Sequence, residues 1–147
     1  MSKYLCVPLA LLVLAAAGCG GDDGGPSKKE YIVDLDKVCK RSNEKIQKVP
    51  APKSIKGIGT YTRKTRPIIE GSIKEAEDLE LPKEQGDGFK AYVTDSKNSL
   101  TGLDDLQKAA DANDTAAVRR VFAKITVENK KRDAQAKKLG LKQCGSG

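Results

Sequence analysis

The chain has 147 residues, a formal net charge of +7 and no histidine. Its length suits one folded domain. Without histidine, the usual general base and metal ligand are missing, which excludes Ser-His and Cys-His nucleophiles and Glu-x-x-His di-iron sites. Haem ligation by His or Met is also excluded, since the single methionine is Met1. We therefore expect no catalytic residues, no metal and no cofactor.

An apolar run near the N-terminus extends from Val7 to Ala17. It covers about 11 residues, whereas a helix that spans a bilayer needs roughly 20, so the run is predicted to be the core of a signal peptide. The four residues Ala16-Ala-Gly-Cys19 follow it directly. They resemble the lipobox of bacterial lipoproteins, in which small residues precede a cysteine that is lipidated and becomes the new N-terminus.

An ordinary A-x-A cleavage site at Ala15-Ala-Ala17 is the alternative, and it would release a soluble protein that begins at Gly18. Lipidation is favoured because Cys19 would otherwise be a stray thiol in an exported chain. The Gly- and Asp-rich stretch after Cys19 also suits a flexible tether. The expected organisation is a signal peptide at 1–18, a lipidated N-terminus and tether at 19–29, and a helical domain at 30–147. The protein is then expected on the outer face of the cell membrane.

The four cysteines divide by position. Cys6 would leave with the signal peptide and Cys19 would carry lipid, which leaves Cys39 and Cys144. Outside the cytoplasm such a pair is predicted to form a disulfide. A metal or redox site is disfavoured because the chain has no CxxC sequence and no histidine.

Four segments carry apolar or small residues at alternating spacings of three and four, the period of one face of an α-helix. They are predicted as helices over 30–49, 54–80, 86–111 and 114–139. Pro50 and Gly140 end the first and last of them, while Ser54 and Asp114 are candidate N-caps for the second and fourth. The apolar face predicted for the last segment contains Val118, Phe122, Ile125, Ala136 and Leu139.

The second segment is the least regular. It contains three glycines, and Pro67 removes one internal hydrogen bond and crowds the carbonyl of Arg63. We expect a kink between Arg63 and Pro67, or two short helices. A kink there either opens a pocket between helices or is an irregularity that packing tolerates.

Together these segments predict an all-α fold, an antiparallel up-and-down four-helix bundle with one helix kinked near Pro67. In such a bundle the last helix returns alongside the first. A short C-terminal tail could then bring Cys144 to Cys39, so that a disulfide closes the fold.

The basic residues of the last helix have two interpretations. They are Lys130, Lys131, Arg132, Lys137 and Lys138. A solvated helix face explains them, and so does contact with an acidic lipid surface or an acidic envelope polymer. Nucleic acid is not expected as a partner, because an exported protein seldom meets it and the basic positions lack interleaved aromatic residues.

Asn129 and Arg132 interrupt the apolar stripe of the last helix. If both face the core, they need an acidic partner or a ligand headgroup, because a buried unpaired charge is costly. A slight rotation of the helix, which lets both side chains reach solvent, is the expected explanation.

The pattern Tyr31-Ile32 with Cys39, and the ending Gly140-Leu-Lys-Gln-Cys-Gly145, resemble a group of small uncharacterised exported lipoproteins of high-GC Gram-positive bacteria. The resemblance implies a lipobox, a Gly/Asp/Ser tether and a helical domain. It implies no biochemical activity and no functional residues.

We expect a membrane-tethered, non-enzymatic interaction or scaffolding lipoprotein of the cell envelope, anchored through Cys19 and able to bind another envelope protein. One alternative is a ligand-binding bundle that holds an apolar or anionic molecule near Pro67. Another is an electrostatic binder of acidic lipid or wall polymer. The sequence does not indicate the pathway or the oligomeric state.

Overall fold

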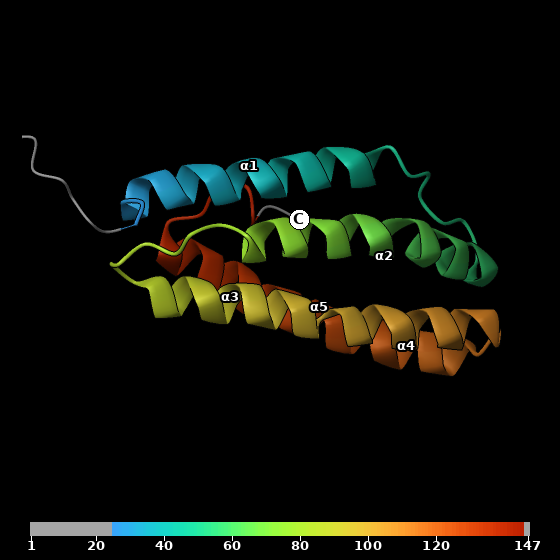
Figure 1. Cartoon of the computed structure of the whole chain (residues 1–147). Helices are drawn as coiled ribbons and strands as arrows, with labels where there is room; N and C mark the ends of the chain where they lie inside the picture. Colours follow the sequence, from blue (N-terminus) through green and yellow to red (C-terminus); the bar gives the residue numbers. More distant parts are fainter. Residues whose placement is uncertain (1–24, 146–147) are drawn as a thin grey trace, which may run out of the picture.

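The computed structural model describes residues 25–145, and these residues form a helical bundle without any strand (Figure 1). The helices are α1 (Lys28–Gln47), α2 (Ile55–Glu77), α3 (Gly86–Asn98), α4 (Leu100–Asp111) and α5 (Thr115–Leu139). The predicted all-α class is therefore confirmed. The predicted signal peptide, the lipidation at Cys19 and the greater part of the tether lie outside the described residues.

Side-chain caps fix where the helices begin. At the start of α1, the Ser27 hydroxyl accepts a hydrogen bond from the Glu30 N–H at 3.3 Å, and the Glu30 carboxylate accepts one from the Ser27 N–H at 2.9 Å. This reciprocal cap starts α1 slightly earlier than predicted. Hydrogen bonds from the side chain and then the backbone of Ser27 hold the pKa of Glu30 below its usual value. Ser54 and Asp114 cap α2 and α5, as predicted.

The second helix, α2, is continuous through Pro67. The alternative of two short helices is therefore wrong. Pro67 itself is exposed, and buried residues lie on both sides of it, Thr65 before it and Ile73 after it. Packing on both sides thus holds the helix together across the residue that cannot donate a backbone hydrogen bond.

The predicted third helix is two helices, α3 and α4, separated at Ser99. The Ser99 hydroxyl donates to the carbonyl oxygen of Ser96 at 2.6 Å, and the Gly102 N–H donates to the Ser99 carbonyl three residues back. Such local hydrogen bonds compete with the regular helical pattern. The apolar period continues across the break, which is why the spacing of apolar residues did not reveal it.

Two groups of buried residues form the core. The larger is centred on Phe89, which is fully buried, and on Tyr31, whose ring centroid lies 4.7 Å from that of Phe89. The smaller joins Leu106 and Ala110 of α4 to Val118 of α5. The prediction that Phe122 lies in the core is wrong, because Phe122 is 59% exposed. In this part of α5, Val118 belongs to the smaller core group and Val121 and Ile125 pack against it, whereas Phe122 lies outside this narrow face.

The arrangement of the helices leaves α1 at one side of the molecule. Helix α2 contacts α1, α3 and α4, while α5 contacts α3 and α4. In Figure 1, α1 lies above α2, and the C-terminal segment in red runs from the end of α5 towards α1. There Cys39 and Cys144 lie at disulfide distance, as predicted, with the sulfur atoms 2.08 Å apart. Gly140, with a φ of 88°, ends α5 and turns the chain into this segment.

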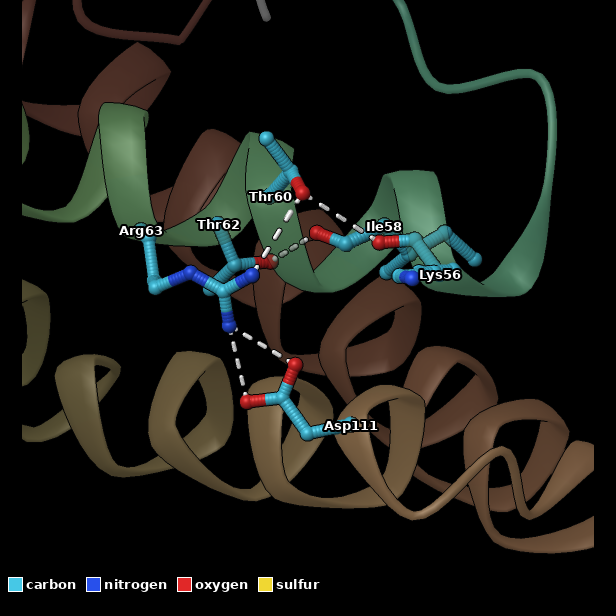
Figure 2. Close-up of polar contacts among 6 residues, drawn as sticks. All are labelled: Lys56, Ile58, Thr60, Thr62, Arg63 and Asp111. Atoms are coloured by element: carbon cyan, nitrogen blue, oxygen red, sulfur yellow. Dashed lines mark hydrogen bonds and ion pairs between the residues drawn. The ribbon is translucent and has the colours of Figure 1, made fainter.

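An ion pair joins α2 to α4 at the other end of the bundle (Figure 2). One nitrogen of Arg63, Nη1, donates to both carboxylate oxygens of Asp111, at 2.7 and 2.8 Å. The other, Nη2, donates to the Thr60 hydroxyl at 3.4 Å. Gly59 leaves space for this contact, because a Cβ atom at that position would lie 2.5 Å from Asp111 Oδ1.

Gly59 and Gly71 of α2 provide a matched pair for testing this contact. A Cβ atom at Gly71 would meet nothing within 4 Å, so Gly71→Ala is expected to raise the free energy of unfolding by about 1 kcal/mol through helix propensity. Gly59→Ala should lose that gain, because the new methyl group displaces Asp111 from Arg63. Chemical denaturation of both variants measures the difference. Equal stabilisation by the two changes would contradict the space requirement at Gly59.

A cleft between four helices

An open cleft of about 220 Å³ lies between α1, α2, α3 and α5. It exists because α1 packs chiefly on α2, while α5 packs on the other side of the bundle. The C-terminal segment bridges the two sides, and both Cys39 and Cys144 line the cleft. The disulfide thus holds α1 and the end of α5 at a fixed separation next to the cleft.

Apolar side chains from α1 and α2 form one wall of the cleft. They include Leu35, Val38 and Ile46 of α1, together with Ile69 and Ile73 of α2. Small residues between them leave the space unfilled. Ser72, for example, lines the cleft and donates its hydroxyl to the Ile69 carbonyl at 2.8 Å, so its polar group is already bonded within its own helix.

Polar and charged side chains of α5 also line the cleft. Asn129, Arg132 and Asp133 of α5 line it. Arg132 is half-buried, and its Nη2 donates to Asn129 Oδ1 at 2.5 Å, which orients the guanidinium. Within residues 25–145, neither Arg132 nor Asp133 forms an ion pair. Half-buried charges of both signs are therefore available at one end of an apolar cleft.

Burial and nearby charges shift the pKa of Tyr92. It is buried and lines the cleft, and its hydroxyl donates to the carbonyl oxygen of Cys144 at 3.2 Å. Burial raises the pKa of Tyr92, the positive charge of Arg132 lowers it, and the negative charge of Asp133 raises it. Both charges therefore act close to this hydroxyl. With its pKa raised, Tyr92 is a neutral hydrogen-bond donor rather than a base.

The C-terminal segment is held by α1 as well as by the disulfide. The Asp36 carboxylate accepts hydrogen bonds from the backbone N–H groups of Lys142 and Gln143, at 3.0 and 2.8 Å. Asn43 donates its side-chain N–H to the Gln143 carbonyl at 3.1 Å. The wall of the cleft that contains Cys144 is thus fixed by three independent contacts with the first helix.

The five basic residues predicted as one anionic-surface contact are divided by the fold. Lys130, Lys131, Lys137 and Lys138 are exposed on α5, whereas Arg132 is half-buried and lines the cleft. Asp95 and Glu128 share a surface depression with Lys131 and Arg132, so negative charge interrupts the basic side of the helix. The expectation that both Asn129 and Arg132 reach solvent is met by Asn129, which is exposed. Arg132 is only half-exposed.

The sequence predicts a ligand pocket near Pro67. The cleft is lined by Ile69 of α2, two residues further along, and not by Pro67 itself. Asp133 and Tyr92 were not singled out. The interruption of the apolar stripe at Asn129 and Arg132 was the available signal, because a core-facing position that carries a polar residue marks a place where the core is incomplete.

Comparison with protein families, curated proteins and solved structures finds no match for this chain. In the part of the chain that the structure describes, no helix is both long and apolar enough to span a membrane. Nor do residues 25–145 contain a cluster of three metal-ligating side chains.

Proposed function

We propose that this protein is a non-enzymatic, membrane-tethered binding module of the cell envelope, whose helical bundle holds a small ligand in the cleft between α1, α2, α3 and α5. The observation that carries the proposal is the combination of an apolar wall with unpaired charges at one end of the same cleft. Ligand sites are commonly concave and mostly apolar, with a few polar groups that orient the ligand.

Filling the cleft tests this proposal. A fluorescent apolar probe should bind the exported protein, and Ser72→Phe should abolish binding, because Ser72 lines the cleft and a phenyl ring would occupy it. Thr101→Phe is the matched control, since Thr101 is exposed on α4 and does not line the cleft. Thermal melting of both variants checks that they fold. Probe binding that survives Ser72→Phe in a folded protein would count against the cleft as the site.

Attachment through Cys19 is part of the same proposal. It is supported by the lipobox-like residues before Cys19 and by the short apolar leader. Cys19→Ser is expected to release the protein into the medium, because two or three acyl chains give stable anchoring and the variant would carry none. Fractionation of cells into membrane and medium measures this. Continued membrane retention of the variant would contradict the anchor.

We also propose kinship with the small exported lipoproteins of high-GC Gram-positive bacteria. The residues that suggest it have structural roles in this protein, which supports the proposal. The Tyr31 ring packs against Phe89 in the core in a tilted arrangement, and Cys39 is bonded to Cys144 of the Gly-Leu-Lys-Gln-Cys-Gly ending. A disulfide-closed helical domain would then be a common feature of the group.

For the arrangement of the helices, we propose an antiparallel up-and-down bundle in which α3 and α4 together form the third of four rods. The contacts of α2 with α1 and α4, and of α4 with α5, support this order. A bend of α2 near Pro67 stays a prediction. Pairs of engineered cysteines at each end of two adjacent helices would test whether the helices are antiparallel, because a crosslink forms only between ends that lie side by side.

Docking of another envelope protein is a second candidate function. It is supported by the exposure of Phe122 and Val127 on α5, at 59% and 54%. A photoreactive side chain at position 122 should crosslink to one recurrent protein in cells, whereas one at position 101 should not. Binding of an acidic polymer through Lys130, Lys131, Lys137 and Lys138 also stays a prediction, and it would weaken steeply with added salt.

A further inference from the structure

We infer that the cleft selects a small zwitterion with an apolar side chain, the chemistry of a free α-amino acid of leucine or phenylalanine size. The inference rests on the proposed function, because it names the class of ligand that the cleft would hold. It is carried by the two opposite charges that line the cleft next to an apolar wall.

The first step is the state of Arg132. Two arginines of the described bundle can be compared, since Arg66 and Arg132 are both half-buried. Arg66 donates to Asp104 at 2.7 Å and to Glu70 at 2.8 Å, so two carboxylates neutralise it. Arg132 donates only to the neutral side chain of Asn129 among residues 25–145. Asp95 and Glu128 line a neighbouring surface depression with Arg132, but neither forms an ion pair with it. Arg132 therefore keeps donors that an added anion can use.

The second step is Asp133, the next residue of α5. It is half-buried, lines the same cleft and makes no ion pair within the described part of the chain. A simple carboxylate ligand at Arg132 would bring a second negative charge close to Asp133, which is unfavourable where water is partly excluded. A ligand with an ammonium group beside its carboxylate instead gives each side chain an opposite charge.

An α-amino acid has this arrangement, because its carboxylate and ammonium groups are attached to one carbon atom. A guanidinium binds a carboxylate through parallel N–H donors, and the bond to Asn129 holds the Arg132 group in place for it. The Asp133 carboxylate accepts hydrogen bonds from the ammonium group. The Tyr92 hydroxyl donates its proton to the Cys144 carbonyl, so that proton is not available to the ligand's carboxylate.

The third step is size. The cleft measures about 220 Å³, and an engineered apolar cavity of about 150 Å³ accommodates benzene. A side chain of leucine or phenylalanine size can therefore lie against Leu35, Val38 and Ile73, with the charged groups towards α5.

Isothermal titration of the exported protein tests the inference. L-Leucine or L-phenylalanine should bind. Leucine amide lacks the carboxylate, 4-methylpentanoate lacks the ammonium group and glycine lacks the apolar side chain, so each should bind about tenfold more weakly or not at all. Arg132→Gln and Asp133→Asn should weaken leucine binding by a similar factor, whereas Arg119→Gln, on the exposed side of α5, should leave it unchanged.

Binding of the fluorescent apolar probe distinguishes failure of the zwitterion inference from failure of the proposed function. If the probe binds but the amino acids do not, or if the analogues bind as tightly as leucine, the zwitterion inference is overturned and the proposed function stands. If the probe does not bind either, the proposed function fails together with the inference. Retained probe binding by Arg132→Gln would show that the variant still has an open cleft.

Discussion

Reduction of the Cys39–Cys144 bond is expected to lower the melting temperature by about 10–20 °C. The bond joins residues 105 positions apart. Closing a loop of this length removes conformational entropy from the unfolded chain worth about 4.7 kcal/mol at most. The packing of α1 makes a large share of that figure realistic, because α1 contacts mainly α2 and depends on the C-terminal segment for its other side.

Calorimetry with and without reductant measures this effect. The double variant Cys39→Ser/Cys144→Ser is the control, since its melting temperature should be low from the start and should not respond to reductant. Hydrogen bonds from Lys142 and Gln143 to Asp36 would remain in the reduced protein, so residual docking of the C-terminal segment is expected. An unchanged melting temperature would mean that packing alone holds α1 in place.

Replacing Phe89 by Ala is expected to destabilise the protein by about 3–5 kcal/mol. The side chain is fully buried and lies against Tyr31, with ring centroids 4.7 Å apart. Truncation would remove its apolar contacts and leave a cavity in the centre of the larger core group. The chain has only two phenylalanines and no tryptophan, so no other aromatic of this kind can take over the role.

The second phenylalanine provides the control for this prediction. Phe122 is 59% exposed, so Phe122→Ala should change the free energy of unfolding by no more than about 0.5 kcal/mol. Urea denaturation of both variants gives the two values directly. Similar losses of stability from Phe89→Ala and Phe122→Ala would refute the assignment of Phe89 to the core. The comparison needs only the larger loss to come from Phe89→Ala, whatever the exact free energies are.

Local chemistry explains which parts of the fold were predictable. Ser54 and Asp114 accept hydrogen bonds from backbone N–H groups at the starts of α2 and α5, and Gly140 adopts a left-handed conformation at the end of α5. Each effect depends on one residue and its immediate neighbours. The pairing of Cys39 with Cys144 followed by elimination among only four cysteines.

The errors arose where tertiary packing decides. The break at Ser99 depends on hydroxyl hydrogen bonds that leave the apolar period unchanged. Phe122 occupies a position of the correct period, but the buried face of α5 is too narrow to include it. The cleft depends on how far α1 lies from α5. The spacing of apolar residues along a helix does not give the distance between two helices, so this feature could not be predicted. Asn129 and Arg132 marked its charged end, whereas its apolar wall looked like ordinary core.

The position of the disulfide also determines how the bundle would respond to tension. A force that pulls the two ends of the folded domain apart follows the shortest covalent path. That path runs along α1 from Lys28 to Cys39 and crosses directly to Cys144. Helices α2 to α5 lie outside this covalent path, so only the first half of α1 can lengthen while the bond is intact. Reduction of one bond would transfer the full load to the non-covalent contacts of the bundle.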